Sequence, residues 1–143
     1  MHSAVEYTDN SVIAQMSVPD MRLCVQYALT HPERTKSVIP ELDLTKIGTL
    51  SFAKPDTETF PLLPLAIHAI ETGGALPAVL NAANEIAVAA FLKEKLSFTG
   101  IFDLVGETVS VLETEAKAQD SLDGIFAMDE KARATATRYL NCF

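Results

Sequence analysis

The sequence has no tryptophan, only two cysteines and only six glycines among its 143 residues. Cys24 and Cys142 lie in unlike surroundings and suggest no disulfide framework, so a reducing cytoplasm is the expected location. None of the glycines forms a G-x-G-x-x-G or G-x-x-x-x-G-K-[ST] phosphate loop. The sequence also lacks C-x-x-C and H-E-x-x-H motifs, which excludes the common metal sites built on them.

Basic residues are scarce, with eleven Lys and Arg against nineteen Asp and Glu and a net charge of −8. Nucleic acid and anionic membranes bind clustered Lys and Arg, so neither is an expected partner. No apolar run reaches transmembrane length, and the N-terminus lacks the pattern of a secretory signal. Hydrophobic residues make up 48% and charged residues 21%, as in an ordinary globular chain of one domain, or of one small domain with an attached fragment.

The first sixteen residues predict a β-hairpin. Strands over residues 2–7 and 12–16 flank a two-residue turn at Asp9-Asn10, which would place Val5 opposite Ala14. Because two strands alone are marginal in water, we expect the chain to be a piece of a larger protein. A surface hairpin without a chemical role is the alternative. The expected buried face consists of Val5, Tyr7, Val12, Ala14 and Met16.

Pro19-Asp20-Met21-Arg22 opens a helix that His31-Pro32 ends, because proline restricts the residue before it. Its apolar residues follow helical spacing and predict a buried stripe. Cys24 lies on that stripe and is expected to be a small core residue rather than a nucleophile. The stripe consists of Met21, Cys24, Val25, Ala28 and Leu29.

Residues 32–56 predict an ordered connector, with a short strand at Thr49–Phe52. From residue 57 onward the pattern predicts a bundle of about four helices. The fold class expected is therefore α+β, with an incomplete α/β piece over residues 1–31 and a helical bundle over 57–143. The expected helices begin near Pro61, Leu76, Thr99 and Ser121, with a last one opening at Asp129.

These helices carry further expectations. Thr99 and Ser121 are the expected caps of their helices. The stripe Leu63, Ala66, Ile67 and Ile70 should face the core, and the helix after Thr99 should do so with the stripe Ile101, Leu104, Val105, Thr108 and Leu112. The helix from Leu76 should run to Leu96. Asn81 and Asn84 interrupt it, and either Asn81 caps the true helix start or both amides bond to a neighbouring segment.

The titratable residues show no catalytic constellation. His31 and His68 lie in separate elements and are expected to be surface or capping residues. His2 differs because it lies at a strand end, next to where the rest of a fold would attach. The acidic pairs Glu113-Glu115 and Asp129-Glu130 are expected to lie on solvated helix faces. The sequence predicts no metal ligands in this chain.

Several blocks, in order along nearly the whole chain, resemble 1-deoxy-D-xylulose 5-phosphate reductoisomerase. The first joins the hairpin, HSAVEYTDNSVIAQM, to Pro19-Asp20-Met21-Arg22, and the second is LNAANEIAV at residues 80–88. Two departures are Asn10 and Ser17, where that family usually has glycine. Shorter matches are Leu50-Ser51-Phe52, Pro55-Asp56 and Ala132-Arg133.

The resemblance implies an NADPH-dependent oxidoreductase and isomerase that uses a divalent metal, Mg or Mn. Such an enzyme forms 2-C-methyl-D-erythritol 4-phosphate in the non-mevalonate route to isoprenoid precursors. It is a homodimer with a nucleotide-binding domain, a catalytic α/β domain and a C-terminal helical bundle. The chain would then contain the end of the catalytic domain, the connector and the bundle. Its partners would be the upstream part of the same enzyme and a second copy paired through the hairpin sheet.

The resemblance implies three site residues. His2 matches a histidine near the family's active site, and Pro19 and Met21 match residues that pack on the substrate or inhibitor and the nicotinamide. An adaptable, apolar methionine suits such a wall. The alternative for Met21 is the first core residue of its own helix. The family's nucleotide-binding turn, metal ligands and phosphate-binding residues have no counterpart here, so this chain alone is expected to be inactive and to hold no cofactor.

A stand-alone acidic helical interaction module, without a catalytic role, is the competing hypothesis. The mixed second face of the hairpin favours the enzyme, because an independent module has no use for that face. The mass of the natural protein would separate the two hypotheses.

Overall fold

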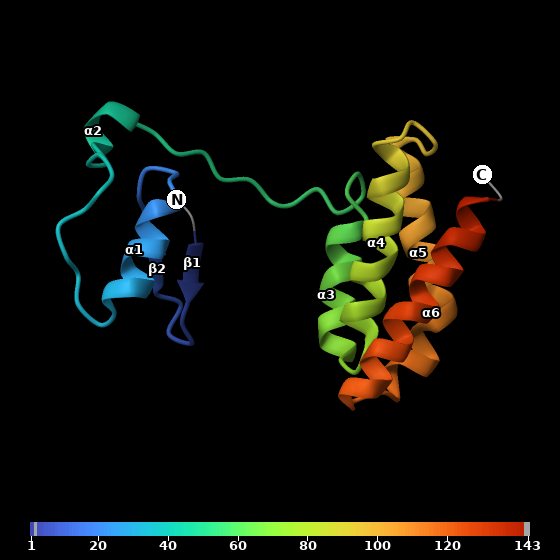
Figure 1. The fold of residues 1–143 in the computed structure, drawn as a ribbon. Helices are drawn as coiled ribbons and strands as arrows, with labels where there is room; N and C mark the ends of the chain where they lie inside the picture. Colours follow the sequence, from blue (N-terminus) through green and yellow to red (C-terminus); the bar gives the residue numbers. More distant parts are fainter. Residues whose placement is uncertain (2, 142–143) are drawn as a thin grey trace. The chain divides into compact units, whose positions relative to one another are not determined.

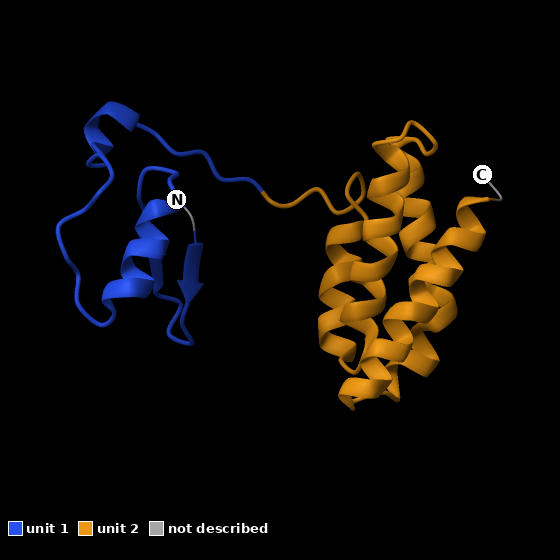
Figure 2. Ribbon diagram, in the orientation of Figure 1, with its two compact units in different colours: residues 1–53 blue, residues 54–143 orange. Residues whose placement is uncertain are grey.

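The computed structural model describes residue 1 and residues 3–141 of the chain. It divides into two compact units, residues 1–53 and 54–143 (Figure 2). The first contains an antiparallel hairpin and two short helices, and the second contains four packed helices (Figure 1). The expected α+β class, with a bundle of about four helices, is confirmed.

The hairpin consists of β1 (Ser3–Glu6) and β2 (Val12–Gln15), joined by a longer turn than the sequence predicted. The Tyr7 N–H donates to the Ser11 carbonyl at 2.9 Å, and the Asn10 N–H donates to the Tyr7 carbonyl at 2.9 Å. Asn10 has a φ of 65°, in the left-handed region that asparagine tolerates. The connection is therefore a three-residue loop whose last residue is left-handed, one of the common hairpin types.

This loop changes the register by one residue. Val5 pairs with Ile13 and Ala4 with Ala14, so the expected pairing of Val5 with Ala14 is wrong. A one-residue shift moves one strand's side chains to the opposite face of the sheet. Val12 therefore no longer shares a face with Val5, and every residue of both strands is exposed. The single buried apolar face does not form.

Helix α1 (Arg22–Thr30) confirms the helix after the hairpin, and it ends at His31 before Pro32. None of its nine residues is buried, so the expected buried stripe is wrong. Cys24 is an exposed free thiol rather than a core residue. The stripe has the correct helical spacing, but nothing in the described chain covers it.

The connector is ordered differently from the expectation. Helix α2 (Leu44–Ile47) begins after Asp43, whose carboxylate accepts a hydrogen bond from the Thr45 N–H at 3.0 Å. Residues 49–52 form no strand. Isolated apolar pairs satisfied the strand pattern there, but residue 1 and residues 3–141 supply no neighbouring strand to pair with them.

The bundle consists of α3 (Leu62–Thr72), α4 (Leu76–Phe91), α5 (Phe98–Lys117) and α6 (Leu122–Leu140). Helix α4 contacts all three others (Figure 1). Its buried residues are mostly small, which lets the neighbouring helices approach closely. In the described part of the chain, no helix is long and apolar enough to cross a bilayer. The buried residues of α4 are Leu76, Val79, Ala82, Ala83, Ala87 and Ala90.

Helix α3 turns a different face to the core from the one expected. Ala69 is buried and Leu62 and Leu65 pack against the core, whereas Ile67 and Ile70 are exposed. The sequence of α3 is apolar around most of its circumference, so spacing alone could not select the inner face. For α5 the expected stripe is confirmed, and its members Ile101, Leu104, Val105, Thr108 and Leu112 are all buried.

Three helix boundaries also differ from the expectation. Helix α4 ends at Phe91 rather than Leu96, and Glu94 in the following loop has a φ of 57°. The α5 cap is Ser97, whose hydroxyl accepts from the Gly100 N–H at 3.0 Å, and not Thr99. Ser121 caps α6 as expected. That helix then runs without interruption, so the expected second start at Asp129 is wrong.

An ionic cluster on the surface joins α4 to α6. Arg133 binds Asp129 one turn earlier, with Nε 2.8 Å from Oδ2, and binds Glu85 of α4 through Nη1 at 2.8 Å. The Asn81 amide donates to the same Glu85 at 3.1 Å, so Asn81 is neither a cap nor a tie to another segment. The hydrogen bond from Arg133 and that from Asn81 lower the pKa of Glu85.

We expect the bundle to fold without the first unit, because its core is built only from residues of α3 to α6 and the segments between them. A shortened chain of residues 55–143 should keep helical circular dichroism and a cooperative thermal melt. Leu104→Ala, at a fully buried position, should lower its stability by about 2–5 kcal/mol. A shortened chain without a cooperative melt would show that the bundle depends on residues 1–54.

Candidate functional site

The sequence pointed to a wall formed by Pro19 and Met21, with His2 nearby. His2 lies outside the described residues. Pro19 and Met21 flank Asp20 in the turn that leads from β2 into α1, and both are exposed. Met21 is 70% exposed, so it is not a core residue of its own helix in this structure. The alternative hypothesis, that Met21 is the first core residue of its own helix, does not agree with this exposure.

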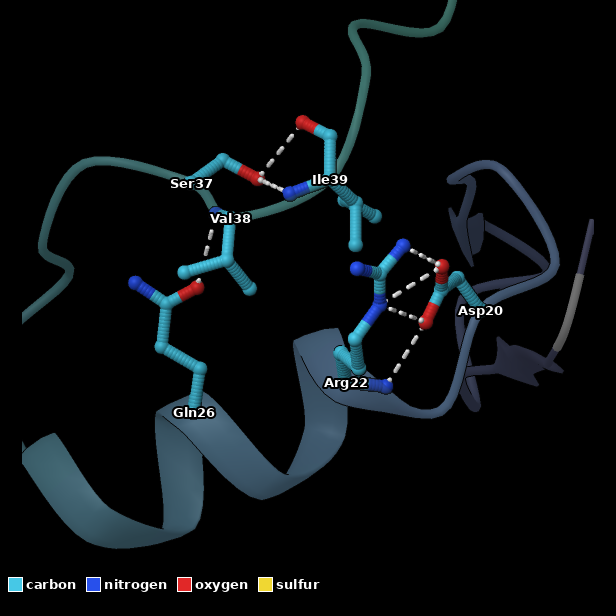
Figure 3. Close-up of polar contacts among 6 residues, drawn as sticks. All are labelled: Asp20, Arg22, Gln26, Ser37, Val38 and Ile39. Atoms are coloured by element: carbon cyan, nitrogen blue, oxygen red, sulfur yellow. Dashed lines mark hydrogen bonds and ion pairs between the residues drawn. The ribbon is translucent and has the colours of Figure 1, made fainter.

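Asp20 is bonded to Arg22 through both side chains and backbone (Figure 3). Arg22 donates from Nε to Oδ1 at 3.0 Å and from Nη2 to Oδ2 at 2.6 Å, the two-point geometry in which a guanidinium fits a carboxylate. The Arg22 N–H also donates to Oδ1 at 2.9 Å. This last bond is the local carboxylate-to-backbone contact that favours helix starts.

These bonds hold the pKa of Asp20 low. The side-chain hydrogen bond from Arg22, followed by the backbone hydrogen bond from the same residue, lowers the pKa from 3.8 to about 2. A carboxyl with a lowered pKa stabilises the folded state fully above its unfolded value, and that contribution is lost as the pH falls through the folded value. The turn is therefore at full strength above about pH 4 and weakens towards pH 2. Near neutrality Asp20 is a fixed negative charge.

Gln26, one turn after Arg22, ties the following segment to α1. Its amide nitrogen donates to the Thr35 hydroxyl at 2.8 Å and to the Lys36 carbonyl at 2.7 Å. Its amide oxygen accepts from the Val38 N–H at 3.2 Å (Figure 3). The side chain thus binds the C=O of one residue and the N–H of the residue two further on, as a neighbouring β-strand would.

Aromatic contacts hold the other end of α1. Tyr27 meets His31 edge-on, with ring centroids 5.6 Å apart, and the Arg34 guanidinium lies 4.6 Å from the Tyr27 ring centroid. This part of the first unit is therefore held by polar and aromatic contacts at its surface, because no residue of α1 is buried.

An open depression of about 220 Å³ adjoins the wall. Its apolar surface is larger than its polar surface, and the charged group on its rim, Asp20, is already paired with Arg22. Such a surface offers van der Waals contact to a ligand. The lining residues are Gln15, Ser17, Val18, Pro19, Asp20, Met21 and Cys24.

The remaining titratable residues do not assemble a second site. His68 of α3 lies 2.9 Å from Glu113 of α5, and Lys131 of α6 is paired with Glu115, so these groups join helices at the bundle surface. Glu113 and Glu115 lie on solvated faces as expected, and each has a partner. Across residue 1 and residues 3–141, no group of three or more His, Cys, Asp or Glu could hold a metal ion.

Sequence reasoning found the Pro-Asp-Met-Arg block but missed two features within and beyond it. One is the ion pair between Asp20 and Arg22, and the other is the Gln26 tie. The first had a signal, since an aspartate just before a helix, with an arginine two residues on, can bond to it locally. The second had none, because the partners of Gln26 lie nine to twelve residues away in an irregular segment.

Comparison with known proteins places these residues in one family. The profile described as DXP reductoisomerase C-terminal domain matches residues 16–135. The chain is 49% identical over 140 residues to a 1-deoxy-D-xylulose 5-phosphate reductoisomerase of Ralstonia nicotianae, covering 98% of this chain and 35% of that protein. It is 53% identical over 136 residues to the enzyme of Chlorobium limicola, covering 95% of this chain and 35% of the relative.

Solved structures agree over nearly the whole chain. The reductoisomerase of Zymomonas mobilis in complex with NADPH superposes with a TM-score of 0.86 at 44% identity, covering 97% of this chain and 36% of that one. A DOX-P reductoisomerase in complex with NADPH, fosmidomycin and magnesium gives a TM-score of 0.90 at 40% identity, covering 98% and 36%. The chain thus spans about a third of the length of the relatives it matches. The chain belongs to the DXP reductoisomerase C-terminal domain family.

Proposed function

We propose that this chain is the C-terminal part of an NADPH-dependent reductoisomerase that converts 1-deoxy-D-xylulose 5-phosphate to 2-C-methyl-D-erythritol 4-phosphate. The observation that carries the proposal is the family match over residues 16–135, supported by solved reductoisomerases that superpose on nearly all of the chain. Within it, residues 1–31 would be the end of the catalytic α/β domain, 32–56 the connector and 57–143 the helical bundle. A cytoplasmic location stays a prediction.

In this proposal Pro19 and Met21 form an apolar wall against the substrate and the nicotinamide, and His2 lies nearby. The exposure of Met21 and the depression beside it support the wall, because the side chain is free to meet a ligand. The wall binds and orients, and it excludes water from the face it covers. In the complete enzyme, bound NADPH would supply a hydride and a bound divalent metal would act as a Lewis acid.

Apart from this wall, the described residues provide no group that would hold the metal or the phosphates of the cofactor. They contain no cluster of possible metal ligands, and the sequence has no phosphate-binding loop. We therefore assign no step of the reaction to this chain through either group. The stand-alone interaction module is disfavoured by the same family match, since the relatives are enzymes about three times as long.

The chain alone should neither bind NADPH nor turn over substrate, because no described element forms a cradle for the phosphates of the cofactor. Titration calorimetry of the 143-residue chain with NADPH should give no saturable heat at micromolar concentrations. The complete enzyme serves as the positive control under the same conditions. Saturable micromolar binding to the chain alone would contradict the proposal that the nucleotide site lies elsewhere in the enzyme.

The wall is tested by Met21→Ala in the complete enzyme. Removal of a side chain that contacts ground state and transition state equally raises KM and leaves kcat unchanged. We expect KM for the substrate to rise about tenfold, as the loss of most of a buried methionine contact implies.

Met21→Leu is the matched control, because it keeps apolar volume at the same position, and its KM should stay within about threefold of the natural enzyme. Kinetics of Met21→Ala identical to those of the natural enzyme would remove Met21 from the wall.

We also propose that two copies associate through the hairpin. The strands expose Val5, Val12 and Ile13. Their outer edges carry backbone groups that are unpaired among the described residues, and such edges template pairing with another strand.

Light scattering of the chain at tens of micromolar should therefore show a dimer or a larger species. Val5→Lys should shift the chain towards monomer, whereas Thr8→Lys in the loop adds the same charge and should not. A monomeric unmodified chain would refute this interface.

A further inference from the structure

The ion pair between Asp20 and Arg22 closes a ring around Met21. These residues are the two chain neighbours of Met21, and two hydrogen bonds of 3.0 and 2.6 Å join their side chains (Figure 3). The backbone bond from the Arg22 N–H to the Asp20 carboxylate at 2.9 Å spans the same residue. The peptide groups on both sides of Met21 are thereby restrained, and its φ and ψ are −64° and −20°.

Packing against a core does not orient Met21 in the described structure. Met21 is exposed, and no residue of the helix that follows it is buried. The direction of the Met21 side chain therefore depends on the local backbone. The Val25 N–H donates to the Met21 carbonyl at 3.1 Å, and the ring formed by the two neighbours of Met21 restrains the same backbone. A partly exposed ion pair contributes little to global stability, so we expect its effect to be local.

We propose that Asp20 and Arg22 are positioning residues for Met21, holding Pro19 and Met21 at the angle at which they meet the substrate. This inference rests on the proposed function, since it assumes that Met21 contacts substrate in the complete enzyme. Wall contacts stabilise a ligand only when the side chain is already oriented, and pre-organisation of this kind reduces the entropy lost on binding.

The chemistry of the pair suits positioning and not proton transfer. The pKa of Asp20 is about 2, and the same pair raises the pKa of Arg22 above its already high value. Both groups are therefore charged throughout the range in which an enzyme of this kind works. Among the residues that line the depression beside the pair, Cys24 is the one other titratable side chain.

The test measures the steady-state kinetics of the complete enzyme with Asp20→Asn and Arg22→Gln, alone and combined with Met21→Ala. Each single change should raise KM for the substrate about two- to fivefold with kcat unchanged, the range expected when an exposed pair is lost. In the Met21→Ala background neither change should have a further effect, because a residue that acts through Met21 has nothing left to position.

Two controls separate this role from general damage. Asp43→Asn removes the charge of a second partly exposed aspartate, which accepts from the Thr45 N–H at 3.0 Å and likewise has a lowered pKa, and it should leave KM unchanged. Arg22→Lys keeps the charge but loses the two-point geometry, so its KM should lie between those of the natural enzyme and Arg22→Gln. The pH profile of kcat/KM should keep its shape in Asp20→Asn.

The outcomes are distinguishable. Silent Asp20→Asn and Arg22→Gln variants, beside an impaired Met21→Ala enzyme, would overturn the inference and leave the wall standing. A silent Met21→Ala enzyme would overturn the wall and the inference together. Effects that add to those of Met21→Ala, a shifted pH profile, or loss of a cooperative melt in both Asp20→Asn and Arg22→Gln would each show that the pair acts in another way.

Discussion

The close contact of α4 with its three neighbours is the constraint on which the bundle depends. Ala82, Ala83 and Ala87 are fully buried, and with no side-chain atoms beyond Cβ they let α5 and α6 lie near the α4 backbone. The larger residues that fill the remaining space come from α5, such as Leu104 and Val105, and from the first turns of α4, Leu76 and Val79. All residues of this core come from the second unit. The described residues of the first unit form no buried core.

The first unit is held by a different set of forces. Asp20 is fixed by Arg22, and Gln26 binds the segment from Thr35 to Val38. Tyr27 meets His31 edge-on and has the Arg34 guanidinium over its ring. Each of these contacts is local or nearly so, and each lies at the surface. They hold the backbone although none of the described residues of this unit is fully buried. Most of its large apolar side chains are exposed, and Met21 of the proposed wall is among them.

Much of this arrangement could be predicted, including the candidate site as a block of sequence. The Pro-Asp-Met-Arg block marked the residues of the proposed wall, and the α5 stripe and the Ser121 cap were recognisable from spacing and residue type. The geometry that makes the block specific was not recognised, since the interaction of Asp20 with Arg22 depends on how the turn is folded. The tie made by Gln26 was out of reach for the same reason, because its partners are set by the course of an irregular segment.

What the sequence determined by itself is therefore periodic or local: the order of the longer helices, the α5 face, the α6 cap and the blocks that mark the family. Tertiary structure decided which of several apolar faces turns inward. Helix α3 is apolar around most of its circumference, and only its contacts with α4 and α5 select Leu62, Leu65 and Ala69 over Ile67 and Ile70. The hairpin register likewise depended on the left-handed Asn10, because one residue of loop length reverses the facing of a strand whereas the alternation of its side chains is the same in either register.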